Sequence, residues 1–374
     1  MLLGAHRGQA EQLPPNTLTP AVQPRATDRN SPHGTRGINE IMADYLFLGA
    51  LNRDFILPVQ GKPLLDVPGG GVLYAAAGAA LWGGSVGLVA RVGEDFPRTW
   101  LDAFRQRGWS TAGIKILPQP LDARRVLIYN PDGSLSAEQP AAAFARRGIA
   151  FPRELLNYAP RPLRRTDLDR PTPATLRLAD LPPGFAEARA AHFCPHDFLT
   201  HHLLPATLRT AGVPFTTLSP HAAYMSPLFI QRIPPLVHGL TAVLTTEAAL
   251  TALFREHTAD LWDMAATIGN WQVNLVVIRR ADGETRLYES RTRRRWVVPG
   301  GPAEVADPTG ADDAFAGAFL VAYRETLDPL QATVRGAATA RIAAETRGVF
   351  ALADTLPALL HARAEALARD VRQV

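Results

Sequence analysis

Short apolar segments with the composition of β-strands alternate with helix-forming segments along most of this 374-residue chain. Strands that alternate with helices form a mainly parallel sheet, because each parallel connection must cross over one face of the sheet. We therefore expect an α/β fold with three layers, in which helices cover both faces of the sheet. The strand-like segments are YLFLGAL (45–51), SVGLVARVG (85–93), ARAAHFC (188–194), VPFTTLS (213–219), LTAVLTT (240–246) and VNLVVIRR (273–280), and helix-like segments include VLYAAAGAALWG (72–83) and EAALTALFREHTADLWDMAATIG (247–269).

The composition predicts a soluble, globular protein with a sizeable core. Of the residues, 47% are apolar and 20% are charged, and no unbroken apolar run is long enough to cross a bilayer. The opening segment, MLLGAHRGQAEQLPPN, lacks the sustained apolar core of a secretory signal, so we expect a cytoplasmic protein. Cys194 is the single cysteine, which excludes an intrachain disulfide and a cysteine-based zinc cluster and favours a small buried residue there.

The basic character of the chain raises the question of nucleic acid. The formal net charge is +4, and arginines cluster in RPLRR (161–165) and RTRRR (291–295). Lys62 and Lys115 are the only lysines, so arginine carries nearly all the positive charge, and both runs fall in polar connecting segments. Neither an aromatic platform nor a recognition-helix pattern accompanies them. We expect solvated loops, with neither nucleic acid nor a membrane as partner.

The N-terminal segment differs in composition from the rest of the chain. Residues 1–41 are rich in proline, glycine, asparagine and threonine and lack apolar periodicity, which predicts a disordered tail. Because Met42 directly precedes the first strand-like segment, an alternative is that translation starts there and the preceding segment is never made. In both cases residues 42–374 are predicted to form a single domain.

One internal stretch is predicted to leave the body of that domain. From Asn130 to Pro183, proline, arginine and alanine recur without a clear period, which indicates a long excursion over the surface. Together with the β-like segment VLIYN (126–130), it is expected to form or support a small β lid within about 121–185.

The segment DPTGADDAFAGAFL (307–320) places a tight turn and two carboxylates in front of an apolar helix. The turn predicts a helix that begins near Ala311 with unpaired backbone N–H groups, and such a helix end attracts phosphate. A carboxylate in the first turn, Asp313, could then accept a proton from an attacking hydroxyl. The alternative is an ordinary helix start, in which Asp307 or Thr309 caps the helix and Asp312 and Asp313 complement its dipole.

Three segments together resemble the ribokinase/PfkB family of carbohydrate and nucleoside kinases. DPTGADDAFAGAF is similar to the C-terminal signature of the family, D-T-x-G-A-G-D followed by an apolar helix. PGGGVLYAAAGAALWGGSVGLVARVGEDFP (68–97) is similar to its glycine-rich first signature, and YLFLGALNRDFIL (45–57) resembles its first strand. The order matches across roughly residues 43–352. The resemblance implies a three-layer α/β/α ribokinase-like fold and an ATP- and Mg²⁺-dependent kinase whose lid often doubles as a dimer surface.

On the substrate side, the resemblance implies that Asn52 and Asp54 hold hydroxyl groups of a sugar or nucleoside. The alternative is a plain turn after the first strand. Gly70 and Gly71, with Gly69 before them, permit close approach of the backbone to a ligand. Tyr74 stands where relatives often carry asparagine, and its ring could stack on the substrate or pack against the sheet.

On the nucleotide side, the resemblance implies an anion hole from the N–H groups of Thr309, Gly310, Ala311 and Asp312, with Asp313 as general base. Asp312 departs from the family, which has glycine there, and its charge has the wrong sign for a phosphate site.

Two further segments also depart from the family pattern. The family motif N-x-x-E, whose glutamate organises the Mg²⁺ shell, lacks its asparagine here, and the glutamate position falls on Glu247 or on Ala249. Glu247 is therefore a candidate metal residue and otherwise a first-turn helix residue. Arg279 and Arg280 stand where the family has a lysine or threonine and a glycine.

These observations leave two hypotheses. In the first, the chain is an ATP-dependent kinase of a small sugar or nucleoside-like metabolite, with Asp313 as base. In the second, it is a degenerate relative that binds a sugar or nucleotide and regulates without turnover. The substrate itself stays open, because the hydroxyl-binding residues are few and Tyr74 breaks the closest analogy.

Overall fold

The computed structural model describes residues 43–136, 138–159, 168, 170–300 and 304–374. The predicted tail, residues 1–41, lies outside the described residues, as does the whole arginine run 161–165. Among the described residues, we find no helix with the length and apolarity needed to traverse a bilayer.

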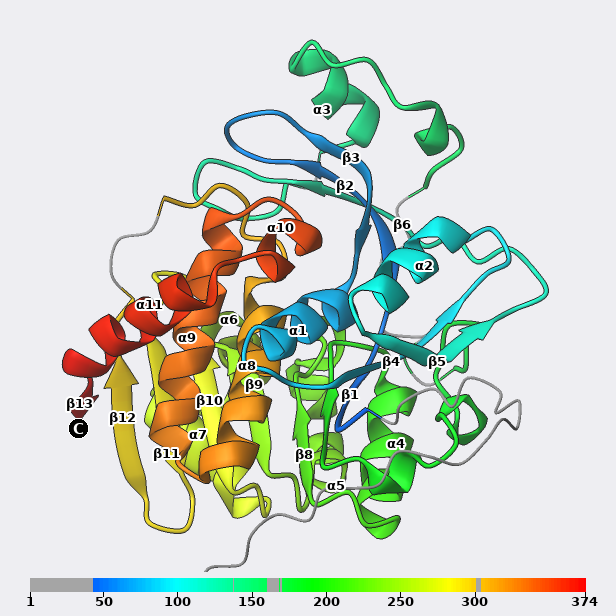
Figure 1. Cartoon of the computed structure of the whole chain (residues 1–374). Coiled ribbons are helices and arrows are strands. Elements are labelled where there is room, and N and C mark those ends of the chain that lie inside the picture. The colour runs from blue at the N-terminus through cyan, green and yellow to red at the C-terminus, as the bar shows by residue number, and fades with distance from the viewer. Residues whose placement is uncertain (1–42, 137, 160–167, 169, 301–303) are drawn as a thin grey trace, which may run out of the picture. The chain divides into compact units, whose positions relative to one another are not determined.

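The body of the fold is a ten-stranded sheet with the order β13-β12-β11-β10-β9-β8-β7-β1-β4-β5 (Figure 1). All pairs from β10 to β5 are parallel, and the last three strands add antiparallel at one edge. The prediction of a mainly parallel sheet is confirmed. Its strands are β1 (Tyr45–Leu48), β4 (Val86–Val92), β5 (Ser110–Ile116), β7 (Ala190–Phe193), β8 (Phe215–Leu218), β9 (Ala242–Thr246), β10 (Leu275–Arg279), β11 (Thr285–Glu289), β12 (Arg294–Val298) and β13 (Arg372–Gln373).

Helices cover both faces of this sheet, which gives the three layers predicted from the sequence. On β1, Tyr45 and Phe47 face one apolar core and Leu46 and Leu48 face the other, because side chains alternate along a strand. The first core contains α1 (Gly71–Ala80), α2 (Arg98–Gln106), α8 (Ala311–Thr326), α9 (Pro329–Glu345), α10 (Val349–Ala353) and α11 (Pro357–Arg369), and the second contains α4 (Phe198–Thr210), α5 (Ile233–Val237), α6 (Glu247–Leu253) and α7 (Leu261–Asn270).

The segment 247–269, predicted as one helical stretch, forms two helices. Helix α6 ends at Leu253, and α7 begins after Asp260, whose carboxylate accepts hydrogen bonds from the backbone of Trp262 and Asp263. An N-cap aspartate inside an apolar-periodic stretch is the signal that separates the two helices.

A second sheet has three strands in the order β3-β2-β6, with β2 (Asn52–Leu57) in the centre (Figure 1). A small β lid was expected within about 121–185, and of the strands of this second sheet only β6 (Arg124–Ile128) comes from that range. Strands β2 and β3 (Leu64–Gly69) come from the segment after the first strand, where a plain turn at Asn52 and Asp54 was the alternative expectation. Both residues instead lie in β2, which is paired on both sides; this pairing buries Asp54 to Leu57 completely and outweighs the turn preference of N-x-D.

Helices α1 and α8 cross at backbone contact through small residues. A Cβ added at Gly317 would lie 1.8 Å from the carbonyl oxygen of Ala75, and one added at Gly78 would lie 2.2 Å from that of Ala314. Glycine is therefore required at both positions. The contact between Gly78 and Ala314 fixes the first turn of α8 against α1.

Candidate active site

A pocket of about 430 Å³ lies at the carboxyl ends of β1, β7 and β8. The strand order changes direction at this point, since the chain passes from β1 to β4 on one side while β7 lies on the other. Open α/β sheets bind ligands at such a switch point. The pocket is lined by Ala50, Asn52, Gly71, Asp122, Ala123, Arg124, Arg125, Tyr158, Ala159, Pro195, His221 and Asp313.

The N-terminal end of α8 opens beside this pocket. As predicted, the helix begins at Ala311, after Gly310 in the left-handed conformation (φ 74°). Of the four predicted phosphate donors, two have internal acceptors: the Thr309 N–H donates to Asp307 Oδ1 at 3.0 Å and the Ala311 N–H to the Pro308 oxygen at 3.3 Å. Within the described part of the chain, the N–H groups of Gly310, Asp312 and Asp313 have no acceptor. These three groups are available to an anion.

Asp313 brings its carboxylate into the pocket, half-buried beside Gly71. A Cβ at Gly71 would lie 2.7 Å from Asp313 Oδ1, so only glycine leaves room for the carboxylate there. Burial raises the pKa of Asp313 to about 7, with a further contribution from Asp312 and an opposing one from Arg125. A carboxyl group with this pKa can both take and release a proton near neutral pH.

Arg125 is a cation that lowers the pKa of Asp313, and the sequence reasoning missed it. Its Nε and Nη2 donate to the two oxygens of Asp54 at 3.0 and 2.8 Å. Asp54 is fully buried and does not line the pocket, whereas the Arg125 side chain is 38% exposed and does. Of the predicted pair Asn52 and Asp54, only Asn52 therefore reaches the cavity, and Asp54 serves to orient Arg125.

Tyr74 packs below the α8 end and not in the pocket. It is buried on α1, and a Cβ at Gly310 would lie 2.0 Å from its ring. Of the two alternatives for Tyr74, the geometry matches packing. Gly70 (φ 101°) caps α1 with its backbone against the Ala50 oxygen, so it shapes the wall of the pocket without lining it.

The unusual residues around the α8 end are paired with each other. Arg279 Nε donates to Asp312 Oδ1 at 2.5 Å, and Arg280 Nε donates to Glu247 Oε2 at 3.0 Å. Arg279, at the end of β10, and the following Arg280 thus each pair with an acidic side chain from another element. Arg280 contacts only Oε2 of Glu247, so a metal ion at this carboxylate would compete with the ion pair. Among the described residues, no group of three or more His, Cys, Asp or Glu side chains could hold a metal ion.

Several of the pocket residues that the sequence reasoning missed lie at strand ends. Arg124 and Arg125 open β6, and His221 follows β8. The rule that parallel strands present ligands at their carboxyl ends could have found His221. No local pattern could have found Arg124 and Arg125, because β6 belongs to the smaller sheet and reaches the site only through its pairing with β2.

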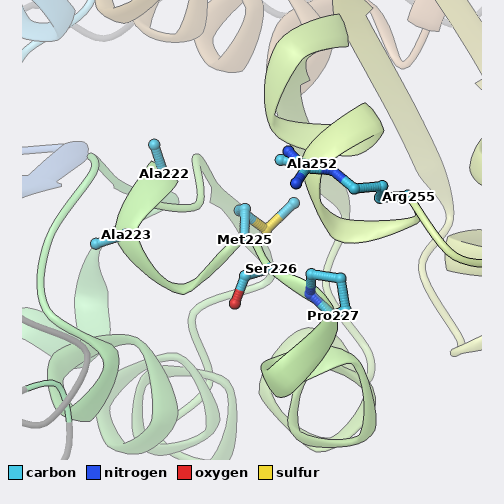
Figure 2. A pocket seen from close by; sticks show the side chains of 7 residues that line it. All are labelled: Ala222, Ala223, Met225, Ser226, Pro227, Ala252 and Arg255. Atoms are coloured by element: carbon cyan, nitrogen blue, oxygen red, sulfur yellow. The ribbon is translucent and has the colours of Figure 1, made fainter.

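A second cavity of about 360 Å³ lies between α6 and the loop after β8 (Figure 2). Figure 2 shows that it contains none of the predicted site residues. It is lined by Ala222, Ala223, Met225, Ser226, Pro227, Ala252 and Arg255.

Comparisons with known proteins find relatives among carbohydrate and nucleoside kinases. Residues 207–356 match the model of the family described as pfkB family carbohydrate kinase. A cytidine kinase from Thermococcus kodakarensis is 28% identical over 297 residues, which cover 79% of this chain and 93% of that protein.

Three solved structures show the same fold. A putative ribokinase II from E. coli has a TM-score of 0.63 at 15% identity, covering 87% of this chain and all of the other. A fructokinase with bound ATP from Xylella fastidiosa has a TM-score of 0.62 at 18% identity with the same coverage. A nucleoside kinase from Burkholderia thailandensis in complex with ADP-inosine has a TM-score of 0.62 at 18% identity, covering 86% of this chain and 95% of the other. The expected ribokinase-like fold is confirmed.

Proposed function

We propose, on the premise that this chain belongs to the PfkB family of carbohydrate kinases, that it transfers the γ-phosphoryl group of ATP to a hydroxyl group of a nucleoside or sugar. One observation carries the proposal: a carboxylate with a pKa of about 7, Asp313, lies in a pocket directly beside backbone N–H groups without acceptors. The carboxylate can act as the base for the alcohol, and the N–H groups can stabilise the charge of the phosphoryl group.

The reaction follows from these two parts. Asp313 takes the proton of the substrate hydroxyl, and the oxygen attacks the γ-phosphorus while the bond to the oxygen that bridges to the β-phosphate breaks. The N–H groups of Gly310, Asp312 and Asp313 donate to the phosphoryl oxygens. Positioning and charge stabilisation of this kind supply most of the catalysis in phosphoryl transfer.

The phosphates of ATP can bind at the N-terminal end of α8, because backbone N–H groups there have no acceptor within the described part of the chain. Mg²⁺ supplies charge neutralisation on the phosphates in such reactions. Among the described residues, no group of three or more His, Cys, Asp or Glu side chains could hold the ion. Glu247 is the candidate side chain that would hold such an ion, in competition with Arg280.

We propose a ribonucleoside as the first substrate class to test. The support is the likeness to a cytidine kinase over most of both chains, together with a pocket of adequate volume that has hydrogen-bonding groups on several sides. The test is ATP consumption and product mass over a panel of ribonucleosides and sugars. A product heavier by one phosphoryl group supports the proposal. If every member of the panel gives only the background hydrolysis of the Asp313→Asn variant, the chain is a binding protein and not a kinase.

The rate is expected to rise with pH through about 7. Asp313 acts in its ionised form, and burial raises its pKa to about 7, so about half of the molecules are active at pH 7 and about a tenth at pH 6. The measurement is kcat/KM between pH 5 and 9 with the best substrate. A tenfold fall per pH unit below 7 and a plateau above 8 are expected; a flat profile from pH 5 to 7 would contradict the assigned base.

Substitution of Arg125 is expected to weaken substrate binding and to shift the pH dependence of kcat/KM. Arg125→Gln removes a pocket donor, which should raise KM by about tenfold, and it removes a cation that favours ionised Asp313, so the inflection moves to higher pH. Because Asp54 would then be buried without a counter-charge, Arg125→Lys serves as the second variant. It should keep the inflection near 7 while KM still rises. An unchanged KM in both folded variants would remove Arg125 from substrate binding.

A further inference from the structure

Asp312 and Arg279 each depart from the family pattern, and the structure places them in contact. Asp312 lies in the first turn of α8, at the end that offers free N–H groups. Arg279 is the last residue of β10, 33 positions earlier in the chain. Its Nε and the Oδ1 of Asp312 are 2.5 Å apart. A contact this short makes the two residues one electrostatic unit.

Arg279 is the fixed partner of this unit. Only 13% of its side chain is exposed, against 57% for Asp312. Its guanidinium lies 5.0 Å from the centroid of the Phe315 ring, on the same helix as Asp312. A guanidinium held by an aromatic face keeps its position, so the exposed carboxylate is drawn towards β10.

Without Arg279, the negative charge of Asp312 would be unfavourable for an anion that binds at the N-terminal end of α8. A carboxylate in the first turn stabilises the empty helix through the dipole, but it repels an anion that binds at the same end. The neighbouring charges do not offset it: Asp313 and Asp54 are also acidic, and Arg125 is already shared with Asp54. Arg279 is the cation whose contact with Asp312 cancels the extra charge.

We infer that Arg279 is a positioning residue that neutralises Asp312 and thereby keeps the end of α8 able to bind a nucleotide phosphate. The inference rests on the proposed function, because it takes the nucleotide as the ligand of this end. It explains how a chain with aspartate in place of glycine retains the site: the substitution at 312 and the arginine at 279 depend on each other.

The test is a double-mutant cycle on the binding of MgATP and MgADP to the full chain by calorimetry. Arg279→Met keeps an apolar stem over Phe315 without the charge, and Asp312→Asn keeps the shape of aspartate without the charge. Arg279→Met alone should weaken nucleotide binding about tenfold, and Asp312→Asn alone should leave it equal or tighter. The double variant should return to within about threefold of the wild type. Arg279→Lys, which keeps the charge, should bind nearly as the wild type does.

The outcomes separate the inference from the function on which it rests. A double variant that binds as weakly as Arg279→Met, or a loss of affinity in Asp312→Asn alone, overturns the inference while leaving the nucleotide site intact. A wild type that binds neither nucleotide overturns both. The exposed pair Arg105 and Asp102 on α2, with N and O atoms 2.8 Å apart, is the matched control. The same substitutions there, Arg105→Met and Asp102→Asn, should leave nucleotide affinity unchanged.

Discussion

Asp313→Asn is expected to lower kcat by about a thousandfold while the affinity for nucleotide is kept. General-base catalysis contributes roughly 10²- to 10⁴-fold, and the amide cannot take the hydroxyl proton. The shape of the side chain is retained, so the free N–H groups of α8 still bind the phosphates. The measurement is kcat for the best substrate together with calorimetric titration of MgATP.

The control for this prediction is Asp307→Asn on the turn before α8. Asp307 is buried and accepts the Thr309 N–H through Oδ1, a bond that the amide oxygen of asparagine can also accept. It does not line the pocket, so this variant should lose far less activity than Asp313→Asn. Similar residual rates in the two variants would show that the turn needs its charges for shape, and Asp313 would lose its assignment as the base.

Those parts of the fold that are encoded locally could be predicted from the sequence. The buried strands of the central sheet are continuous apolar runs, which is typical of parallel strands covered on both faces. The start of α8 was predicted at Ala311 because proline and glycine precede an apolar-periodic segment. The smaller sheet was only partly predicted, because β2 carries polar residues at its start and its burial depends on partners from two distant segments.

In the candidate site, too, features encoded in one local segment could be predicted, and features that depend on distant segments could not. Asp313 and the start of α8 lie in one continuous segment, so the sequence locates both, but of the four predicted N–H donors only those of Gly310 and Asp312 lack an internal acceptor among the described residues. The ion pairs do not follow from any local pattern, since Arg279 and Asp312 are 33 residues apart and Arg125 and Asp54 are 71 apart. Considered one at a time, Asp312 and Arg279 departed from the family pattern, and the missing asparagine left Glu247 only a candidate metal residue. In the structure each of these three side chains has a partner of opposite charge.

The crossing of α1 and α8 leads to the second large effect. Gly317→Ala is expected to destabilise the folded state by about 3 kcal/mol and to lower Tm by about 5 °C. The new Cβ would lie 1.8 Å from the carbonyl oxygen of Ala75, which is backbone and cannot rotate away. The intrinsic helix preference of alanine over glycine offsets only about 1 kcal/mol of this.

Gly336→Ala on α9 is the matched control, because it also lies within a buried helix but the three atoms nearest to its Cβ would all belong to the Phe315 ring, the first at 2.8 Å. A ring edge can shift by a few tenths of an ångström, so the loss should be clearly smaller than for Gly317→Ala. Equal Tm shifts would contradict the conclusion that backbone contact limits the approach of α1 and α8.

The crossing also positions the site, because a Cβ at Gly78 would lie 2.2 Å from the oxygen of Ala314, one residue after the proposed base. If α8 is displaced at Gly317, Asp313 moves relative to Gly71, and kcat should fall in Gly317→Ala even at temperatures where the protein remains folded. A folded Gly317→Ala variant with wild-type kcat would show that the α8 end is held by other contacts.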